Sequence, residues 1–531
     1  MSHAVTRMVP NARTIDAKGA ICSKVVIRAT VLDAGFSFPV VLALVGLTLL
    51  ARASAFFHVV IDWDESLYAL VARELLHGGW PYVAVWENKP PFLFLIIAGF
   101  FKALGENIVA LRLAGDAAVV AAAYLIYLVG NRFPGSGKAL GWAAAVLYVA
   151  VTANDGGLAS NAEIFAAPFI CGALLVASSS SEQRSSMSFA RSAWLGLWLG
   201  LAIQIKLTVV PEAVAIAGLA LLFWRVSWRH ATLIVAVAVV PFALGVAAYA
   251  YGGHLAAYVD ANFLGDLRRV GEWNAAPAAP AGISNAFLGQ LGQLRPLSIL
   301  APLAAVLVWR HGHEQALTRR LVAAILAWWA IDALTISATN EFNGHQFVSL
   351  MAPMALLSGY ALWALMRHLP LRRAWMVAAV AIGYLMNAAG PIAQAANIAE
   401  HRIVLRDATW GDPDARLGAL LRSKMRGNRS LFVMHQQPVL YFLTNSALPT
   451  KYAYPPFLEE PSFERVAGID GAAEVARIRS ASPQFIVGSI YVFDADSRTV
   501  QAELAQLYPK YRLIFTSDGT MIYQLVHTAK R

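Results

Sequence analysis

Three acidic residues directly follow the first apolar stretch of the chain, and carboxylates there could either do chemistry or cap a helix. Asp62, Asp64 and Glu65 stand in the segment IDWDESLY, where a membrane span would end. Acids at such a depth are costly unless they are solvated or used, so a catalytic carboxylate is one interpretation. The other is that Asp62 or Asp64 caps the following helix and Glu65 complements the helix dipole. This stretch alone does not choose between the two.

A lysine stands at the end of the same outer segment. Lys89 precedes Pro90 and Pro91 in the segment WENKPP. Because proline fixes the backbone, this turn would hold the lysine in a defined direction. For the motif by itself, the plainer interpretation is a lysine that snorkels to the membrane surface before a proline turn.

The residues between the acids and the lysine have the pattern of an amphipathic helix. Its apolar residues recur at helical spacing and two glycines stop it: Leu67, Tyr68, Val71, Leu75 and Gly78-Gly79. The aromatic residues that follow suit the headgroup layer: Trp80, Tyr82 and Trp86. We therefore expect a helix that lies on the outer membrane surface, with the acids at its N-terminus.

The composition places these elements in a membrane. Of the 531 residues, 58% are hydrophobic and 14% are charged, whereas soluble domains average about 45–50% apolar and about 25% charged residues. We therefore expect a polytopic membrane protein, in which the net charge of +10 sets orientation and implies no nucleic-acid partner. The two cysteines, Cys22 and Cys171, provide neither a disulfide framework nor a cysteine-based metal site.

Long apolar runs predict an all-α transmembrane bundle of about 11 spans, since a span needs about 20 apolar residues, or fewer where neighbours cover its ends. They lie at 38–59, 107–130, 139–154, 163–178, 193–208, 209–224, 231–251, 296–309, 321–337, 346–366 and 375–395. With the N-terminus inside, the loops rich in Arg and Lys fall on the cytoplasmic side and the acids on the outer side. The run 91–104 is too short to span, so a re-entrant or interfacial helix is expected there.

The composition changes after about residue 396 to that of a soluble domain. Short strands are predicted at 431–434, 484–488, 511–516 and 520–526, and helices at 438–443, 472–478 and 500–507. These elements predict a small C-terminal α/β domain. The expected division is a basic cytoplasmic segment 1–37, a transmembrane domain 38–395 with the outer loop 60–106, and an extracytoplasmic domain 396–531.

An ordered set of motifs runs through the predicted outer loops. The first loop holds Asp64-Glu65, Tyr68, Ala72-Arg73-Glu74, Gly78, Trp80 and Lys89-Pro90-Pro91. Later ones are Gly105-Glu106, Arg112-Leu113, Asn161-Ala162-Glu163, Gly200 with Lys206, and Gly344-His345-Gln346-Phe347 with Pro353. Together they resemble the GT-C glycosyltransferases, in particular bacterial relatives of the dolichyl-phosphate-mannose protein mannosyltransferases and of the lipid A aminoarabinose transferase. The resemblance covers residues 38–395, is strongest over 61–113, and implies a GT-C type bundle.

The resemblance implies an inverting transfer of a sugar from a polyprenyl-phosphate donor to a hydroxyl of an acceptor. By match to the family motif, Asp64 is the general base, and Glu65 beside it orients the site or contacts substrate. Glu163 is the second acid of the site, with an acid at a helix N-terminus as the alternative. The sequence names no cofactor; Asp64 and Glu163 would be the ligands of a Mg²⁺ or Mn²⁺ ion if one takes part.

Positive side chains are needed to stabilise the phosphate that leaves. The candidate substrate-binding residues are Tyr68, Lys89, Arg112, Lys206, Arg268, Arg269 and His345. Lys206 ends an apolar span, where a charge is functional by default and snorkelling is the alternative. Arg268 and Arg269 lie in the long outer loop 252–295 and would otherwise form a solvated pair, and a lone histidine such as His345 is otherwise structural.

The expected protein is a glycosyltransferase of the bacterial inner membrane, with its active site and C-terminal domain on the extracytoplasmic face. Its partners would be a polyprenyl-phosphate sugar, the bilayer and a cell-envelope acceptor (lipopolysaccharide or lipid A, another glycan, or a protein), and it would act as a monomer. One alternative is a transporter or flippase of lipid-linked substrates, for which inverted repeats and paired broken helices are expected. Another is a non-catalytic membrane scaffold.

Overall fold

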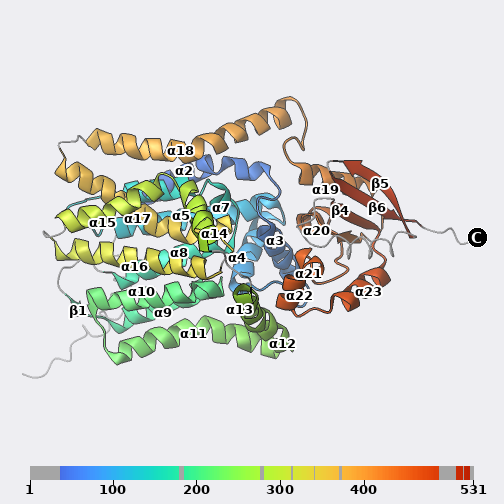
Figure 1. The fold of residues 1–531 in the computed structure, drawn as a ribbon, viewed down its shortest axis with the longest axis horizontal. Coiled ribbons are helices and arrows are strands. Elements are labelled where there is room, and N and C mark those ends of the chain that lie inside the picture. The colour runs from blue at the N-terminus through green and yellow to red at the C-terminus, as the bar shows by residue number, and fades with distance from the viewer. Residues whose placement is uncertain are drawn as a thin grey trace, which may run out of the picture.

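Helices dominate the computed structural model, which describes residues 36–178, 184–275, 280–311, 315–339, 341–369, 373–427, 429–489, 510–517 and 519–526. Most of them run side by side along the long axis of the molecule, and a smaller unit with strands lies at one end (Figure 1). The chain therefore has the helical bundle that its composition predicts. Nearly all of the predicted segment 1–37, and the whole predicted helix 500–507, lie outside the described residues.

A helix covers most of each predicted apolar segment. These helices are α2 (Phe38–Ala51), α5 (Ile108–Gly130), α6 (Ala139–Val151), α8 (Ala162–Ala177), α9 (Phe189–Ile203), α10 (Val210–Phe223), α11 (Trp228–Tyr251), α15 (Leu297–His311), α16 (Ala316–Thr339), α17 (Val348–His368) and α18 (Arg373–Ala399). Within the described residues, five helices are long and apolar enough to cross a membrane, or six if the bent pair Asn285–Gln293 and Leu297–Arg310 is one span. The other apolar helices are shorter, so the count of eleven spans stays a prediction.

The first predicted span, 38–59, is divided in the structure. α2 ends at Ala51, and the short 3-10 helix η1 (Ala53–Phe57) follows. Arg52 stands at the break, fully buried, with its Nε 2.5 Å from Asp116 Oδ1 in α5. Its other nitrogens donate to Thr152 O at 2.7 Å and Leu158 O at 2.9 Å. Because a buried charge is costly unless it is paired, this break holds α2 against α5 and the chain that follows α6.

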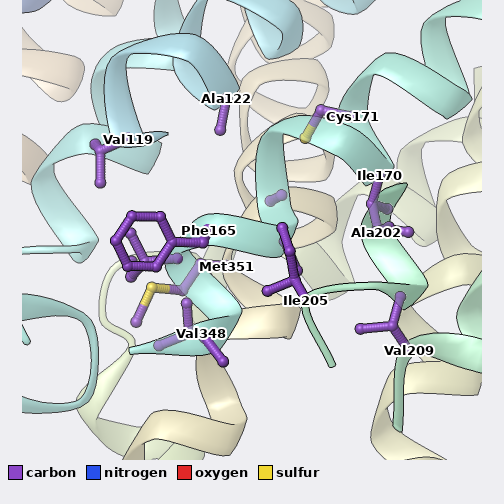
Figure 2. Close-up of a cluster of buried hydrophobic side chains, with 14 of the residues drawn as sticks. Val119, Ala122, Phe165, Ile170, Cys171, Ala202, Ile205, Val209, Val348 and Met351 are labelled. Carbon is purple, nitrogen blue, oxygen red and sulfur yellow. The ribbon is translucent and has the colours of Figure 1, made fainter. Parts of the chain in front are cut away.

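The interior of the bundle is filled by apolar side chains from several helices. Figure 2 shows part of it, with Phe165 and Ile170 of α8, Met351 of α17 and Ala202 of α9 among the side chains of one buried cluster. All of these side chains are buried. Since lipid tails are as apolar as the helices, close packing of this kind holds membrane helices together.

Two glycines let α9 approach α11 closely. A Cβ atom on Gly196 would lie 2.4 Å from Ile234 O, and one on Gly200 would lie 2.4 Å from Ala238 O. Glycines four residues apart share one face of a helix and bring backbones into contact in membranes. This packing fixes the end of α9, and Lys206 lies in the short connection from α9 to η2 (Leu207–Val209).

The segment 60–106, predicted to be an outer loop, begins with α3 (Trp63–Leu76) and ends with α4 (Pro91–Leu104). α3 starts and stops where its sequence predicts, with Asp62 as its N-cap and Gly78 at φ +87° after its end. Its side chains from Glu65 to Arg73 are buried, however, because α4 and the helix α20 (Val439–Thr444) of the C-terminal segment pack against it. The middle of the helix is therefore enclosed by protein, while its place on the outer membrane surface stays a prediction.

Short helices close the other connections at this end of the bundle. They are α7 (Asp155–Leu158), η2 (Leu207–Val209), α12 (Leu255–Val259), η3 (Asp260–Leu264), α13 (Gly265–Ala275), α14 (Pro280–Gln293), η5 (Gly344–Phe347) and η6 (Glu400–Val404). At the opposite end, the two-residue strands β1 (Ser185–Ser186) and β2 (Trp224–Arg225) pair in parallel. The charged side chains described below come from the first of these two ends.

The C-terminal segment forms a four-stranded sheet with helices beside it. The strands are β3 (Leu431–Val433), β4 (Phe485–Ser489), β5 (Tyr511–Ser517) and β6 (Thr520–Leu525), in the order β3-β4-β6-β5. β3 and β4 are parallel and the other pairs are antiparallel. The helices are α19 (Pro413–Lys424), α20, α21 (Pro456–Glu459), α22 (Pro461–Ala467) and α23 (Gly471–Ala481). Each predicted strand falls on an observed one, while the division of the chain into separate domains stays a prediction.

The C-terminal segment is docked on the outer loop. Trp86 N donates to Lys451 O at 2.8 Å, and the Trp86 ring meets the Phe457 ring edge-on with 4.7 Å between their centres. On α3, Arg73 Nη1 donates to Tyr441 O at 3.2 Å. Polar and aromatic contacts thus join the C-terminal segment to the last turns of α3 and to the loop that follows it.

Candidate active site

Charged side chains from six separate segments meet at the end of the bundle that faces the C-terminal segment. Lys89, His345, Lys206 and Arg269 all lie close enough to Asp64 to act on its charge. We call this group the Asp64 cluster; its members are Asp62, Asp64, Lys89, Glu163, Lys206, Arg269 and His345. Most of the site residues predicted from the sequence are therefore brought together by the fold.

Asp64 is held at the start of α3 by its neighbours. Asp62 Oδ1 accepts a hydrogen bond from Asp64 N at 3.0 Å and so caps the helix. Asp64 is half-buried, and its Oδ2 accepts from the hydroxyl of the buried Tyr68 at 3.2 Å. Burial acts to raise the pKa of Asp64, but the positive charges of Lys89 and His345 outweigh it and leave that pKa below its ordinary value. The side chain is therefore a carboxylate at neutral pH.

Lys89 is fixed by its own loop. Tyr82 Oη donates to Lys89 O at 2.8 Å, and the Lys89 Nζ lies 3.1 Å from Glu87 Oε1 and 2.9 Å from Asn88 Oδ1. Burial raises the pKa of Glu87. Burial acts to lower the pKa of Lys89, but Glu87 and Asp64 outweigh it and raise that pKa. The lysine is thus a cation that points into the site; it does not snorkel.

Two further ion pairs border the cluster. Lys206, in the connection from α9 to η2, pairs with Glu163 in the first turn of α8, and both side chains are largely buried. Arg269 of α13 pairs with Glu341, with its Nη2 2.9 Å from Glu341 Oε1. These pairs place a lysine and an arginine around the Asp64 carboxylate from two sides.

Glu65 and Arg112 form a second group behind the first one. Arg112 Nη2 donates to Glu65 Oε1 at 2.7 Å, and Ser160 N donates to Glu65 Oε2 at 2.8 Å. Glu65 is 1% exposed and Arg112 is 0% exposed. Arg112 also donates to two backbone oxygens, Ala55 O at 3.0 Å and His58 O at 3.1 Å. We call Glu65, Arg112 and Ser160 the Glu65 cluster. Its two charged side chains pair with each other and form hydrogen bonds with the backbone.

Arg268 also has other partners. Its Nη2 lies 3.0 Å from Asp260 Oδ1, and its Nε donates to Val466 O of the C-terminal segment at 2.9 Å. It therefore links α13 to α22, whereas its neighbour Arg269 acts on Asp64. Of the cationic side chains predicted to bind phosphate, Arg112 and Arg268 are the two that do not belong to the Asp64 cluster.

One group of side chains has the spacing of metal ligands. Within the described part of the chain, a carboxylate oxygen from each of Asp62 and Asp64 and a ring nitrogen of His345 all lie within 4.8 Å of one another. Two carboxylates and one imidazole suit an ion such as Zn²⁺ or Mn²⁺ better than Mg²⁺, which prefers oxygen ligands. Glu163 was expected to take part in any metal site together with Asp64, but its carboxylate pairs with Lys206.

Three acids around the Asp64 cluster were not predicted from the sequence to be site residues. Glu87 pairs with Lys89, Asp266 accepts from Asn88 Nδ2 at 2.8 Å, and Glu341 pairs with Arg269. Glu87 carried a signal, since it stands two residues before Lys89 in the same motif. The other two acids lie in loops far along the chain, where no spacing relates them to the lysine or to the arginine.

This fold and site define a multi-pass membrane protein with a carboxylate surrounded by cations at one end of its bundle. The sequence matches the family model of the dolichyl-phosphate-mannose-protein mannosyltransferases over residues 88–247. No curated protein matches the chain in sequence.

The fold is similar to that of ArnT from Cupriavidus metallidurans. The structure of that protein bound to undecaprenyl phosphate aligns with a TM-score of 0.64 and 14% identity, over 97% of this chain and 99% of ArnT. The apo structure aligns with a TM-score of 0.60 and 15% identity, over 92% and 98% of the two chains. At these identities the likeness shows the fold. The family match covers part of the chain, and the fold of nearly the whole chain is similar to that of ArnT.

Proposed function

We propose that the protein transfers a sugar, with inversion, from a polyprenyl-phosphate donor to a hydroxyl group of a cell-envelope acceptor. The observation that carries the proposal is the Asp64 carboxylate, half-buried and surrounded by Lys89, His345, Lys206 and Arg269. ArnT was solved with undecaprenyl phosphate, a lipid phosphate of the class that would remain when the sugar leaves such a donor. The acceptor class is lipopolysaccharide or lipid A, another envelope glycan, or a protein.

In the proposed reaction Asp64 is the general base. Its carboxylate takes the proton of the acceptor hydroxyl while that oxygen attacks the anomeric carbon from the face opposite the phosphate. The bond between the anomeric carbon and the phosphate oxygen breaks, and its electron pair stays on the phosphate. The products are the glycosylated acceptor and free polyprenyl phosphate. The low pKa of Asp64 keeps the base unprotonated before the reaction.

The cations of the cluster would stabilise the leaving phosphate. Lys89, Lys206 and Arg269 approach from three different segments, so a phosphate between them would accept charge-assisted hydrogen bonds from several sides. We give Tyr68 the role of orienting Asp64, because its hydroxyl donates to that carboxylate. Glu163 would hold Lys206 in place through their ion pair.

The Glu65 cluster would position the base and not touch substrate. Glu65 bonds back to the N–H of Asp62 at 3.4 Å and pairs with Arg112, so it fixes the first turn of α3 from behind. An ion held by Asp62, Asp64 and His345 would add positive charge near the donor phosphate. The three cationic side chains supply that charge in the step proposed here.

The test is the release of free polyprenyl phosphate by the purified full-length protein in detergent. A panel of polyprenyl-phosphate sugars is supplied with a membrane glycolipid extract, and Asp64→Asn is compared with the unchanged protein. Removing a general base typically costs about 10²–10⁴-fold in rate. We expect a loss in that range for Asp64→Asn, with an unchanged melting temperature.

A matched variant controls for the loss of a carboxylate in general. Asp470 caps α23 in the C-terminal segment, accepting from Ala473 N at 3.1 Å, and asparagine caps a helix about equally well. Asp470→Asn should therefore release polyprenyl phosphate at the normal rate. Release that is equal in Asp64→Asn and the unchanged protein would reject Asp64 as the base. Absence of release with every donor and acceptor would favour a protein that moves or holds the lipid.

A further inference from the structure

A large groove lies at the end of the bundle away from the C-terminal segment. It has a volume of about 1080 Å³ and lies between the start of α6, the end of α17 and the first half of α18, with Leu47 of α2 at its wall. Figure 1 shows that α18 runs from that end of the bundle toward the C-terminal segment. The groove is therefore at the opposite end from the Asp64 cluster, and the proposed reaction does not use it.

The walls of the groove are apolar. They include Trp142 of α6, Trp363 of α17 and Val377, Ala381 and Leu385 of α18. Val377 is 69% exposed and Leu385 is 54% exposed, so this face of α18 has no protein cover within the described chain. Such a wall inside a membrane suits a hydrocarbon chain.

The mouth of the groove is basic. Lys138, Arg367 and Arg373 line it, and the described lining includes no acid. Arg367 lies over the Trp363 ring, with 5.5 Å from its guanidinium carbon to the ring centre, which directs it toward the groove. Basic pockets between membrane helices on the cytoplasmic side bind the head groups of anionic lipids. The charge of the mouth thus complements a phosphate.

The length of the groove fits one leaflet of a bilayer. On α18 it extends from Arg373 to Leu385, and twelve residues of helix rise by about 18 Å. Half of the hydrocarbon core is about 15 Å. At the deep end Tyr384 Oη donates to Leu47 O at 2.8 Å and ties α18 to α2 there. A lipid with short chains matches this depth, whereas a polyprenyl chain is much longer than one leaflet.

We propose that this groove is a binding site for an anionic phospholipid, with its phosphate at Lys138, Arg367 and Arg373 and an acyl chain along α18. The occupant is a lipid of the leaflet opposite the reaction, not the sugar donor. The proposal is independent of the proposed function, because it predicts binding whether or not the protein transfers a sugar.

The experiment measures lipid binding to the detergent-purified full chain by native mass spectrometry. The protein is titrated with phosphatidylglycerol and with phosphatidylcholine of the same acyl chains. We expect one molecule of phosphatidylglycerol to bind at least about tenfold more tightly than phosphatidylcholine, since each basic residue near an anionic headgroup contributes about fivefold. The triple variant Lys138→Gln, Arg367→Gln, Arg373→Gln should lose about tenfold or more of that affinity.

A matched triple variant removes the same charge outside the groove. Arg225, Arg229 and Arg310 are exposed and do not line the groove, and Arg229 lies over Trp228 as Arg367 lies over Trp363. Their replacement by Gln should change affinity by less than about twofold if the three mouth residues form the site. A further variant, Ala381→Trp, fills the groove and keeps every charge, so it should weaken phosphatidylglycerol binding as strongly as the mouth variant. Melting temperatures without added lipid show which variants are folded.

Three results would overturn the proposal. The first is equal binding of phosphatidylcholine and phosphatidylglycerol. The second is an equal loss in the matched triple variant, which would mean that the whole basic end attracts the lipid. The third is displacement of phosphatidylglycerol by equimolar undecaprenyl phosphate in the unchanged protein, together with loss of undecaprenyl phosphate binding in Ala381→Trp, which would assign the groove to a polyprenyl phosphate.

Discussion

Asp64 and Glu65 are neighbours in the sequence, yet they belong to two clusters with opposite properties. The Glu65 cluster is closed: Glu65 is 1% exposed, Arg112 is 0% exposed, and the carboxylate also accepts from Ser160 N. The Asp64 cluster is open: Asp64 is half-buried, and the cations near it come from several separate segments. A pair whose charges are fully matched can only hold structure together, whereas a carboxylate among cations retains capacity for a ligand.

The comparison shows how one helix start serves both purposes. The first turn of α3 directs successive side chains to different faces, since adjacent residues on a helix point about 100° apart. Glu65 therefore faces α5, where Arg112 lies, and Asp64 faces Lys89 and His345. The Glu65 cluster therefore provides a rigid support for the Asp64 cluster.

The largest expected effect is the loss of stability in Glu65→Gln. Removing one partner of a buried ion pair leaves an uncompensated charge, here on Arg112, and typically costs about 3–5 kcal/mol. We expect the free energy of unfolding in mixed detergent to fall by that amount, while Asp64→Asn leaves it unchanged. Glu74→Gln is the matched control on the same helix, because the Glu74–Arg73 pair is partly exposed and should contribute about 0–1 kcal/mol. Equal stability of Glu65→Gln and Glu74→Gln would contradict the structural role given to the Glu65 cluster.

The next effect concerns Lys206. If Lys206 binds the leaving phosphate, Lys206→Met should lower kcat/KM for polyprenyl phosphate release by about 10–100-fold, the range of one charge-assisted hydrogen bond. This variant also leaves Glu163 without its partner. The double variant Glu163→Gln, Lys206→Met should therefore regain stability without regaining activity. Recovery of activity in the double variant would show that Lys206 only neutralises Glu163.

A smaller effect is expected in the pH dependence. The general base works as a carboxylate, so activity falls as pH falls through the pKa of Asp64, which Lys89 holds below its ordinary value against the effect of burial. Lys89→Met removes that attraction, so the acidic limb of the pH–rate profile should move to higher pH. Lys102→Met removes an exposed lysine from α4 and should leave the limb in place. If the acidic limb does not move in Lys89→Met, Lys89 does not set the pKa of the general base.

The smallest expected effect is that of chelation. Because Lys89, Lys206 and Arg269 already supply positive charge beside Asp64, EDTA should leave the rate of polyprenyl phosphate release unchanged. The measurement is the rate after EDTA treatment and after addition of Zn²⁺, Mn²⁺ or Mg²⁺. A loss with EDTA that one of these ions restores would assign a metal to Asp62, Asp64 and His345.

The sequence predicts what is local and leaves open what depends on distant partners. The bounds of α3 follow from a capping residue, an apolar repeat and a glycine, all within a short stretch. The sequence does not decide whether Asp62 or Asp64 caps the helix; the structure gives that role to Asp62, which leaves the Asp64 side chain for another role. Local rules could not show that α20, hundreds of residues later, covers the helix.

The buried arginines show most clearly what cannot be predicted from the sequence. Arg112 was expected to bind phosphate because it stands in a family motif, but its charge is paired with Glu65, 47 residues before it. Arg52 is a charge inside a predicted span, and its partner Asp116 lies 64 residues further along the chain. A buried arginine needs a carboxylate partner. Spacing along the chain does not identify that partner.

The docking of the C-terminal segment on the outer loop has a consequence for biosynthesis. Arg73 and Tyr441, which are hydrogen-bonded across this contact, are 368 residues apart. At 5–20 residues per second, a ribosome needs about 20–70 s to make the chain between them. During that interval α3 has emerged without this cover. Synthesis of α20, rather than insertion of the preceding helices, therefore marks the moment at which α3 is enclosed.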